Sequence, residues 1–183
     1  MYASLTEPFI KSIPREQISW LDNVLTGKEE LERRVVVHKE NDLEEGFILG
    51  RDLKFNGGAE ENLYLLVIPF RKDILSLRDL RGEHLPLLRA IVDVSERAVE
   101  EVFGVARTKV YLYVHYYPSY YHFHVHVCHY KVVQGGKHQL GKCVFLREII
   151  QNLELDGDYY KKASMAVVLG SRDPIYKLLA SKT

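Results

Sequence analysis

The stretch YVHYYPSYYHFHVHVCHY, residues 113–130, decides the fold because it carries two strand patterns around a turn. A Pro-Ser pair marks the turn, and the residues on either side are mostly aromatic or β-branched. After the turn, three histidines alternate with apolar residues, and side chains in a strand alternate between its two faces. We therefore expect His122, His124 and His126 to form a row on one face of a strand, with the apolar residues packed in the core.

The rest of the apolar pattern predicts an α+β fold: an antiparallel sheet of about five strands with one long helix and shorter helices. The long helix is expected at 83–103, where apolar residues recur at helical spacing until Gly104. The expected strands are 35–38, 46–50, 63–70, 109–117, 121–133 and 164–169. Short helices are expected from the Ser12 and Pro14 signal to Gly27, and at 28–33, 142–153 and 174–180.

Composition excludes several classes of protein. The 183 residues fit one domain, and 25 basic against 25 acidic residues give zero net charge, which argues against a DNA-coating protein. No apolar run approaches the ~20 residues that span a bilayer, and the N-terminus lacks the pattern of a secretory signal. With two cysteines, Cys128 and Cys143, we expect no disulfide scaffold and a reducing cytoplasmic or nuclear location.

Five of the eight histidines lie within residues 115–129, and this clustering favours a chemical role. A solvated polar face is one alternative, although surface strands do not usually repeat histidine three times. A metal site is another, because His-x-His on a strand can chelate zinc or iron. No Asp or Glu occurs between Glu101 and Glu148, so the neighbouring sequence supplies no carboxylate ligand. We therefore expect no metal, and only a distant acid would complete such a site.

The same interval is rich in cations, which favours a polyanionic substrate such as a phosphate ester. The cations are Arg107, Lys109, Lys131, Lys137, Lys142 and Arg147. A neutral imidazole nitrogen is a competent nucleophile at phosphorus, and a neighbouring imidazolium can protonate the leaving oxygen, because histidine titrates near neutral pH. Donors and cations would offset the developing charge without a metal cofactor.

The run HFHVHV resembles the signature of the histidine triad superfamily of nucleotide hydrolases and transferases. Over about residues 8–180, the chain resembles the C-terminal catalytic domain of the scavenger mRNA decapping enzyme family. The runs that carry the resemblance are HYYPSYYHFHVHV, NLYLLVIPFRKDILSLRDL, EHLPLLR and WLDNVL. The resemblance implies a histidine triad-like sheet and a single catalytic domain over residues 1–183.

The resemblance also implies a role for each histidine of the motif. In that family the central histidine attacks the phosphate attached to 7-methylguanosine, and water hydrolyses the phosphohistidine that forms. His124 matches this nucleophile, and His126 matches the histidine that assists the leaving group. His122 matches the triad member that orients the nucleophile, and His115 matches an upstream histidine near the phosphates.

Substrate-binding positions follow from the resemblance in the same way. The positions that match the phosphate contacts and the nucleotide cleft are Asp52, Leu53, Lys54, Ser119, Tyr120 and Lys142. A 7-methylated guanine is a cationic purine, which prefers an electron-rich aromatic face. Trp20, the single tryptophan, matches the stacking position, and Glu30 matches the carboxylate that accepts from guanine N–H groups. Core packing for Trp20 and a solvated helix face for Glu30 are the alternatives.

The sequence departs from the family pattern at three positions and at its N-terminus. Lys142 stands where the family often has arginine, Arg51 where it commonly has proline, and Phe55 where it has tryptophan. Family members carry an N-terminal domain that swaps between subunits and helps to close the cleft, and this chain begins almost at the catalytic domain. We therefore expect a more open site and weaker cap binding. Because histidine triad proteins usually pair through sheets and long helices, we also expect a homodimer.

The expected function is metal-independent hydrolysis of the triphosphate bridge in 7-methylguanosine cap nucleotides or short capped RNA, which releases 7-methylguanosine monophosphate. One alternative is a general histidine triad hydrolase of dinucleoside polyphosphates or phosphoramidates. A cap-binding module without turnover is the non-enzymatic alternative. The expected partners are capped nucleotides and a second copy of the chain, with neither DNA nor membrane.

Overall fold

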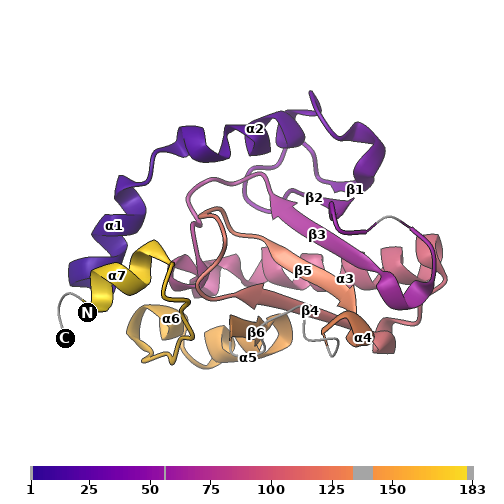
Figure 1. The fold of residues 1–183 in the computed structure, drawn as a ribbon. Helices are drawn as coiled ribbons and strands as arrows, with labels where there is room; N and C mark the ends of the chain where they lie inside the picture. The colour runs from indigo at the N-terminus through magenta and orange to yellow at the C-terminus, as the bar shows by residue number, and fades with distance from the viewer. Residues whose placement is uncertain (1, 56, 134–141, 181–183) are drawn as a thin grey trace.

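Six strands form one antiparallel sheet in the part of the chain that the computed structural model describes, residues 2–55, 57–133 and 142–180. Their order is β1-β2-β3-β5-β4-β6 (Figure 1). The strands are β1 (Arg34–His38), β2 (Phe47–Arg51), β3 (Tyr64–Pro69), β4 (Val110–His115), β5 (Val125–His129) and β6 (Cys143–Phe145). The predicted α+β class with an antiparallel sheet is confirmed, and the sheet has one strand more than the five expected.

Helices pack on both faces of this sheet. The long helix α3 (Leu85–Phe103) and α5 (Leu146–Leu155) share one buried cluster with strand residues such as Leu65. Helix α2 (Ser19–Thr26) packs on Ile68, three residues further along the same strand and therefore on the opposite face. The other helices are α1 (Glu7–Ser12), α4 (Tyr130–Val132), α6 (Tyr159–Lys162) and α7 (Pro174–Ala180).

Short helical turns connect these elements. Six are 3-10 turns: η2 (Arg15–Ile18), η3 (Leu31–Arg33), η4 (Glu60–Asn62), η5 (Leu77–Asp79), η6 (Gly82–His84) and η7 (Arg107–Lys109). The segment η1 (Tyr2–Thr6) is π-helical and contacts α7, so the two ends of the described chain lie side by side (Figure 1). None of the helices described is both long and apolar enough to cross a bilayer.

The long helix forms where its apolar spacing predicts it. Leu88, Ile91 and Val99 are fully buried against the sheet. Gly104 ends the helix with a φ of 65°, a left-handed conformation that disfavours any residue with a Cβ. The predicted end of this helix is therefore confirmed.

The histidine segment is less regular than its alternation predicts. The expected strand 121–133 is wrong in extent, because β5 covers only Val125–His129 and turns into α4 after it. The backbone N–H of Phe123 donates to Ile74, in a segment that follows the end of β3, so no strand pairs with residues 121–124. The apolar residues between the histidines do pack in the core, as predicted.

Three other sequence predictions are wrong. Residues 142–153 do not form a single helix, because Cys143–Phe145 adds to the sheet beside β4 before α5 begins. Residues 28–33 give only the turn η3, since Glu30 has a φ of 55° that interrupts a helix. Residues 164–169 form no strand; they lack a strand partner, although Met165 and Val167 alternate onto the core.

Candidate active site

The two ring nitrogens of His124 differ, because one is hydrogen-bonded and the other has no hydrogen-bond partner among the described residues. It lies just before β5, is 2% exposed, and its Nδ1 lies 2.8 Å from the carbonyl oxygen of His122. A carbonyl oxygen only accepts hydrogen bonds, so Nδ1 carries the proton and Nε2 keeps its lone pair. Nε2 is buried without a hydrogen-bond partner among the described residues. Burial lowers the pKa of His124 to about 4, so the ring is neutral at pH 7.

His122 holds the segment that orients His124. Its Nε2 donates to the carbonyl oxygen of Pro69 at 2.9 Å, at the end of β3. Burial lowers the pKa of His122 to about 4, so this ring is also neutral. The side chain of His122 is thus fixed to the sheet, while its own carbonyl fixes the ring of His124.

His126 lies on β5 between two tyrosines from the neighbouring strands. Its Nδ1 lies 2.9 Å from the hydroxyl of Tyr64 on β3. The ring of Tyr113 on β4 stacks on it, with ring centres 5.0 Å apart and planes at 19°. The rings of His115 and His124 also contact it, at centre distances of 4.4 Å and 5.1 Å. The structure therefore brings together all four histidines that the sequence singles out.

A cavity of about 830 Å³ adjoins this cluster. Five of the predicted site residues line it: Lys54, His115, Ser119, Tyr120 and Lys142. Lys11, Arg15 and Lys72 add three further cations to its wall, and Asp173 is the one acidic residue among the described residues that line it. The predicted cation Lys137 lies outside the described residues. This excess of positive charge suits a phosphate-bearing ligand.

Tyr120 lies between the cavity and the ring of His124. The two rings stack with centres 4.2 Å apart and planes at 15°. The hydroxyl of Tyr120 is buried and has no hydrogen-bond partner among the described residues. Because Tyr120 also lines the cavity, its ring covers the imidazole on the side that a ligand would approach.

Four predicted substrate residues do not line the cavity. Trp20 is 40% exposed and contacts Tyr120 edge-on at 5.4 Å, so it adjoins the site through that ring. Glu30 lies 4.0 Å from Arg33. The carboxylate of Asp52 accepts from the backbone N–H of Lys54, and Leu53 is 66% exposed. The described residues thus place the predicted phosphate contacts around one cavity, whereas the four predicted base contacts lie outside its lining.

Part of the cavity wall comes from the two ends of the described chain, and no sequence motif predicts it. Phe9 and Ile13 from the N-terminal side meet Leu169 and Ile175 from the C-terminal side. Only folding brings such distant apolar residues together. Lys142 also differs from expectation, because it precedes strand β6 rather than a helix, and its Nζ lies 3.7 Å from Asp173.

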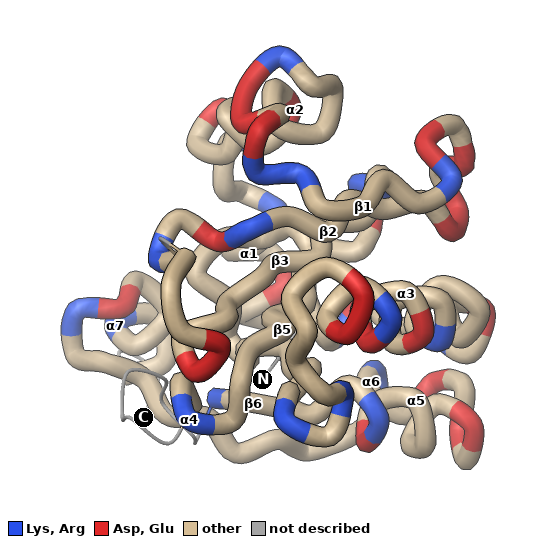
Figure 2. Tube along the Cα trace, turned by 90° about the vertical axis from the view of Figure 1, so that its right-hand side faces the viewer, with Lys and Arg blue, Asp and Glu red and all other residues tan. Residues whose placement is uncertain are grey.

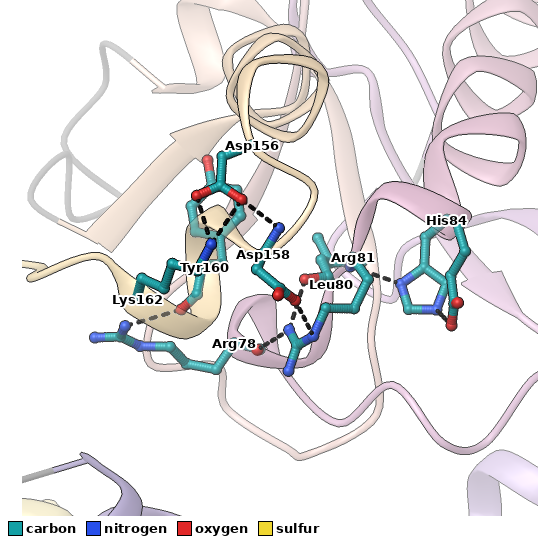
Figure 3. A network of polar contacts seen from close by, with 9 residues as sticks. Arg78, Leu80, Arg81, His84, Asp156, Asp158, Tyr160 and Lys162 are labelled. Atoms are coloured by element: carbon teal, nitrogen blue, oxygen red, sulfur yellow. Dashed lines mark hydrogen bonds and ion pairs between the residues drawn. The ribbon is translucent and has the colours of Figure 1, made fainter.

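A buried arginine connects the aromatic turn to the C-terminal wall of the cavity. Arg78 donates to the hydroxyl of Tyr116 and to the carbonyl oxygens of Tyr160 and Ala163. Figure 3 shows it within a network that joins η5 and η6 to α6. The residue after Tyr116 lines the cavity, and the chain beyond Ala163 leads to Leu169. Arg78 therefore ties two segments of the cavity wall to one another.

The surface charge beyond the cavity is mixed. Figure 2 shows Lys and Arg interspersed with Asp and Glu along the chain, in keeping with a net charge of zero. Within the described ranges, no three His, Cys, Asp or Glu residues are close enough to hold a metal ion. The positive character is thus local to the cavity.

Comparison with known proteins agrees with this geometry. Residues 19–141 match the family described as scavenger mRNA decapping enzyme C-term binding. The chain is 38% identical to the m7GpppX diphosphatase of Ascaris suum over 96% of this chain and 57% of that protein, and 38% identical to that of Rattus norvegicus over 97% and 52%. The Schizosaccharomyces pombe protein of the same name is 34% identical over 99% and 59%.

The chain spans about half the length of the curated relatives it matches. The matched residues include the histidine segment, the long helix and strands β1 to β5. On this match and on the arrangement of its four histidines, the chain belongs to the scavenger mRNA decapping enzyme family.

Proposed function

We propose that this chain is the catalytic domain of an enzyme that hydrolyses the triphosphate bridge of 7-methylguanosine cap nucleotides or short capped RNA. The observation that carries the proposal is the bare, unprotonated Nε2 of His124, next to a cavity lined with lysines. The names of the relatives, which act on m7GpppX, support the choice of substrate.

In the proposed reaction, Nε2 of His124 attacks the phosphorus next to 7-methylguanosine. The bond to the bridging oxygen breaks, and its electron pair leaves with the nucleoside diphosphate while His126 assists that oxygen. Water then attacks the phosphorus. A new phosphorus–oxygen bond forms, the electron pair of the phosphorus–nitrogen bond returns to Nε2 of His124, one proton passes to the solvent, and 7-methylguanosine monophosphate leaves. Lys54 and Lys142 offset the charge on the phosphates. We expect Tyr120 to move first, because Nε2 of His124 is buried and the ring of Tyr120 lies between His124 and the cavity.

Base recognition completes the proposal. Trp20 provides an exposed aromatic face for the cationic purine, and Glu30 provides a carboxylate for its N–H donors. In the proposal, Asp52 and Leu53 contact the base or ribose from beyond the cavity lining, and Lys54, which lines the cavity and is bonded to Asp52 through its backbone N–H, contacts a phosphate. Ser119 and His115 contact the phosphates from the turn and from β4.

The test is product analysis after incubation with a methylated cap dinucleotide in the absence of metal. We expect 7-methylguanosine monophosphate and a nucleoside diphosphate, and loss of both in His124→Asn. His129→Asn is the matched control, because His129 is buried at the far end of β5 and does not line the cavity. Hydrolysis by His124→Asn at the parental rate would contradict the proposal.

A second candidate is a general hydrolase of dinucleoside polyphosphates or phosphoramidates. One observation favours it: Trp20 is exposed and does not line the cavity, so the described residues do not enclose a methylated base there. Comparing methylated with unmethylated cap dinucleotides separates the two candidates. Equal rates, unchanged in Trp20→Ala, support the general hydrolase, whereas a preference that Trp20→Ala abolishes supports the cap enzyme.

The same assay addresses the remaining alternatives. Tight binding of the methylated dinucleotide without product indicates a binding module. Activity that disappears with a chelator and returns with zinc indicates a metal-dependent reaction.

We extend the proposal to a homodimer in the cytoplasm, with a nuclear fraction. Two free cysteines suit a reducing compartment. Sedimentation of the purified chain tests the dimer, and imaging of the tagged protein tests the location.

A further inference from the structure

We propose that Tyr64 is a positioning residue that fixes His126 with its proton on Nε2, so that His126 donates a hydrogen bond to the leaving phosphate oxygen. This inference rests on the proposed function, because it concerns the same reaction. It assigns a role to a tyrosine that the sequence motif does not contain. The observation behind it is the 2.9 Å contact between the Tyr64 hydroxyl and Nδ1 of His126.

The sheet register explains how Tyr64 reaches this ring. Leu66 lies directly opposite His126 across β3 and β5, and Tyr64 lies opposite Cys128. Tyr64 is therefore a diagonal neighbour on the same face, at a distance that an aromatic side chain spans. From the other side, Tyr113 lies directly opposite His126 and stacks on its ring. The imidazole is thus held by a hydroxyl from one strand and a ring from the other.

The direction of the hydrogen bond follows from the surroundings of Tyr64. Burial raises the pKa of Tyr64 far above its ordinary value. Tyr64 therefore remains a phenol with a proton to donate. Its own proton is then available to Nδ1 of His126, and a neutral imidazole that accepts at Nδ1 carries its proton at Nε2.

The two catalytic histidines then carry opposite tautomers. His124 donates through Nδ1 to a backbone carbonyl, which leaves Nε2 free to attack. His126 accepts at Nδ1 from Tyr64, which leaves an N–H at Nε2 to donate. The leaving group is a nucleoside diphosphate, whose terminal phosphate has a pKa near 6, so it departs as an anion and needs a hydrogen bond rather than a proton. The electron pair of the broken bond stays on that oxygen, and His126 stays neutral.

Several other titratable groups lie around His126 and bear on any pH dependence of its role. They are His124 on its own segment, Tyr64 and Lys54 on the side of β3, and Tyr113, His115 and Cys128 around β4 and β5. Lys54 lies over the ring of Tyr64, 5.5 Å from its centre. His126 itself is 6% exposed, so its ring is largely shielded from water.

The first experiment is nitrogen-15 NMR of the histidine side chains in the parent chain at pH 7. We expect the proton of His126 on Nε2 and that of His124 on Nδ1, and in Tyr64→Phe we expect His126 to lose its single tautomer. This readout needs no activity, so it decides the inference even if no cap nucleotide is hydrolysed. A proton on Nδ1 of His126 in the parent chain would overturn it.

The second experiment is the pH–rate profile of Tyr64→Phe with the methylated cap dinucleotide. We expect kcat to fall about tenfold or more with little change in KM, because the hydroxyl acts on the leaving group rather than on binding. In Tyr64→Phe the decrease in kcat should become larger from pH 6 to pH 8. Without the hydroxyl of Tyr64, only a protonated His126 is sure to carry a proton on Nε2, and protonation becomes rarer as the pH rises. The parent profile should stay level over that range.

Tyr111→Phe is the matched control. Tyr111 lies two residues before Tyr113 on the same face of β4, and its ring packs on Phe145. We expect parental rates from this control. A Tyr64→Phe enzyme that unfolds at the parental temperature yet keeps the parental kcat and pH profile would contradict the inference.

Discussion

At the scale of single residues, the three histidines of the motif differ in which nitrogen is hydrogen-bonded, and this gives identical side chains different chemistry. His122 donates through Nε2, whereas His124 donates through Nδ1. In each case a backbone carbonyl oxygen determines which ring nitrogen carries the proton. The sequence could predict which residue types gather, but not the tautomers, because the carbonyl of Pro69 is brought to His122 only by the pairing of β3 with β5.

The buried histidines make stability depend on pH. His122 and His124 have pKa values of about 4 in the folded chain against an ordinary 6.5, so the unfolded chain binds more protons between these values. The contribution of these two histidines to the free energy of unfolding should be complete above pH 6.5, decrease as the pH falls to about 4, and change no further below that pH. Each histidine contributes up to ~3 kcal/mol to this decrease.

Urea unfolding at a series of pH values from 7.5 to 4 measures the slope. Asn does not titrate, so His124→Asn should show a clearly shallower decrease. An equal slope in the two proteins would show that His124 has an ordinary pKa in the folded state.

The buried hydroxyl of Tyr120 lacks a partner in the described chain, so removing it should favour the folded state. We expect Tyr120→Phe to raise the free energy of unfolding by about 1 kcal/mol, since an unsatisfied buried donor is costly. If that hydroxyl binds phosphate, KM should rise about fivefold in the same variant. Chemical denaturation and steady-state kinetics measure the two effects, and a destabilised variant would argue against an unpartnered hydroxyl.

At the scale of elements, the parts of the fold predicted best from sequence are those with long apolar patterns and clear stop signals. Helix α3 and its end at Gly104 are examples. Strand β6 was missed, because three residues at a sheet edge carry no periodic pattern of their own and depend on β4 for pairing. The predicted strand at 164–169 is wrong for the opposite reason. Alternate residues of this segment pack on the core, but the segment does not pair with a strand.

The connection through Arg78 should be important for stability. Arg78→Ala leaves the buried carbonyl of Tyr160 and the partly buried carbonyl of Ala163 without this donor, and we expect the free energy of unfolding to fall by about 3 kcal/mol. Arg89→Ala is the control, because Arg89 pairs with Glu154 at the surface and should change stability by less than about 0.5 kcal/mol. Thermal or urea unfolding compares the two, and equal effects would contradict a special role for Arg78.

At the scale of the whole molecule, the site depends on parts of the chain that are far apart in sequence. The motif predicted the histidines and several phosphate contacts. It could not predict the wall formed by Phe9, Ile13, Leu169 and Ile175, because only the packing of the chain ends brings them together. For the same reason the cluster of cations around the cavity is invisible in a net charge of zero.

This local charge predicts a dependence on salt. The KM for a cap dinucleotide should rise several-fold between 50 and 300 mM salt, with little change in kcat, because the cations act mainly on binding and are screened over ~10 Å. Lys142→Ala should raise KM and weaken this dependence. Lys109→Ala is the control, because Lys109 pairs with Glu60 and does not line the cavity. A KM independent of salt would contradict a cationic binding site.

The contact between Trp20 and Tyr120 has a practical consequence. Trp20 is the single tryptophan, its ring meets Tyr120, and Tyr120 covers His124. Whenever Tyr120 swings aside to admit a ligand, the only indole in the chain changes its surroundings. The intrinsic fluorescence of the unlabelled protein should therefore report the opening of the nucleophile directly, and a rapid-mixing trace of its emission would time that motion apart from bond cleavage.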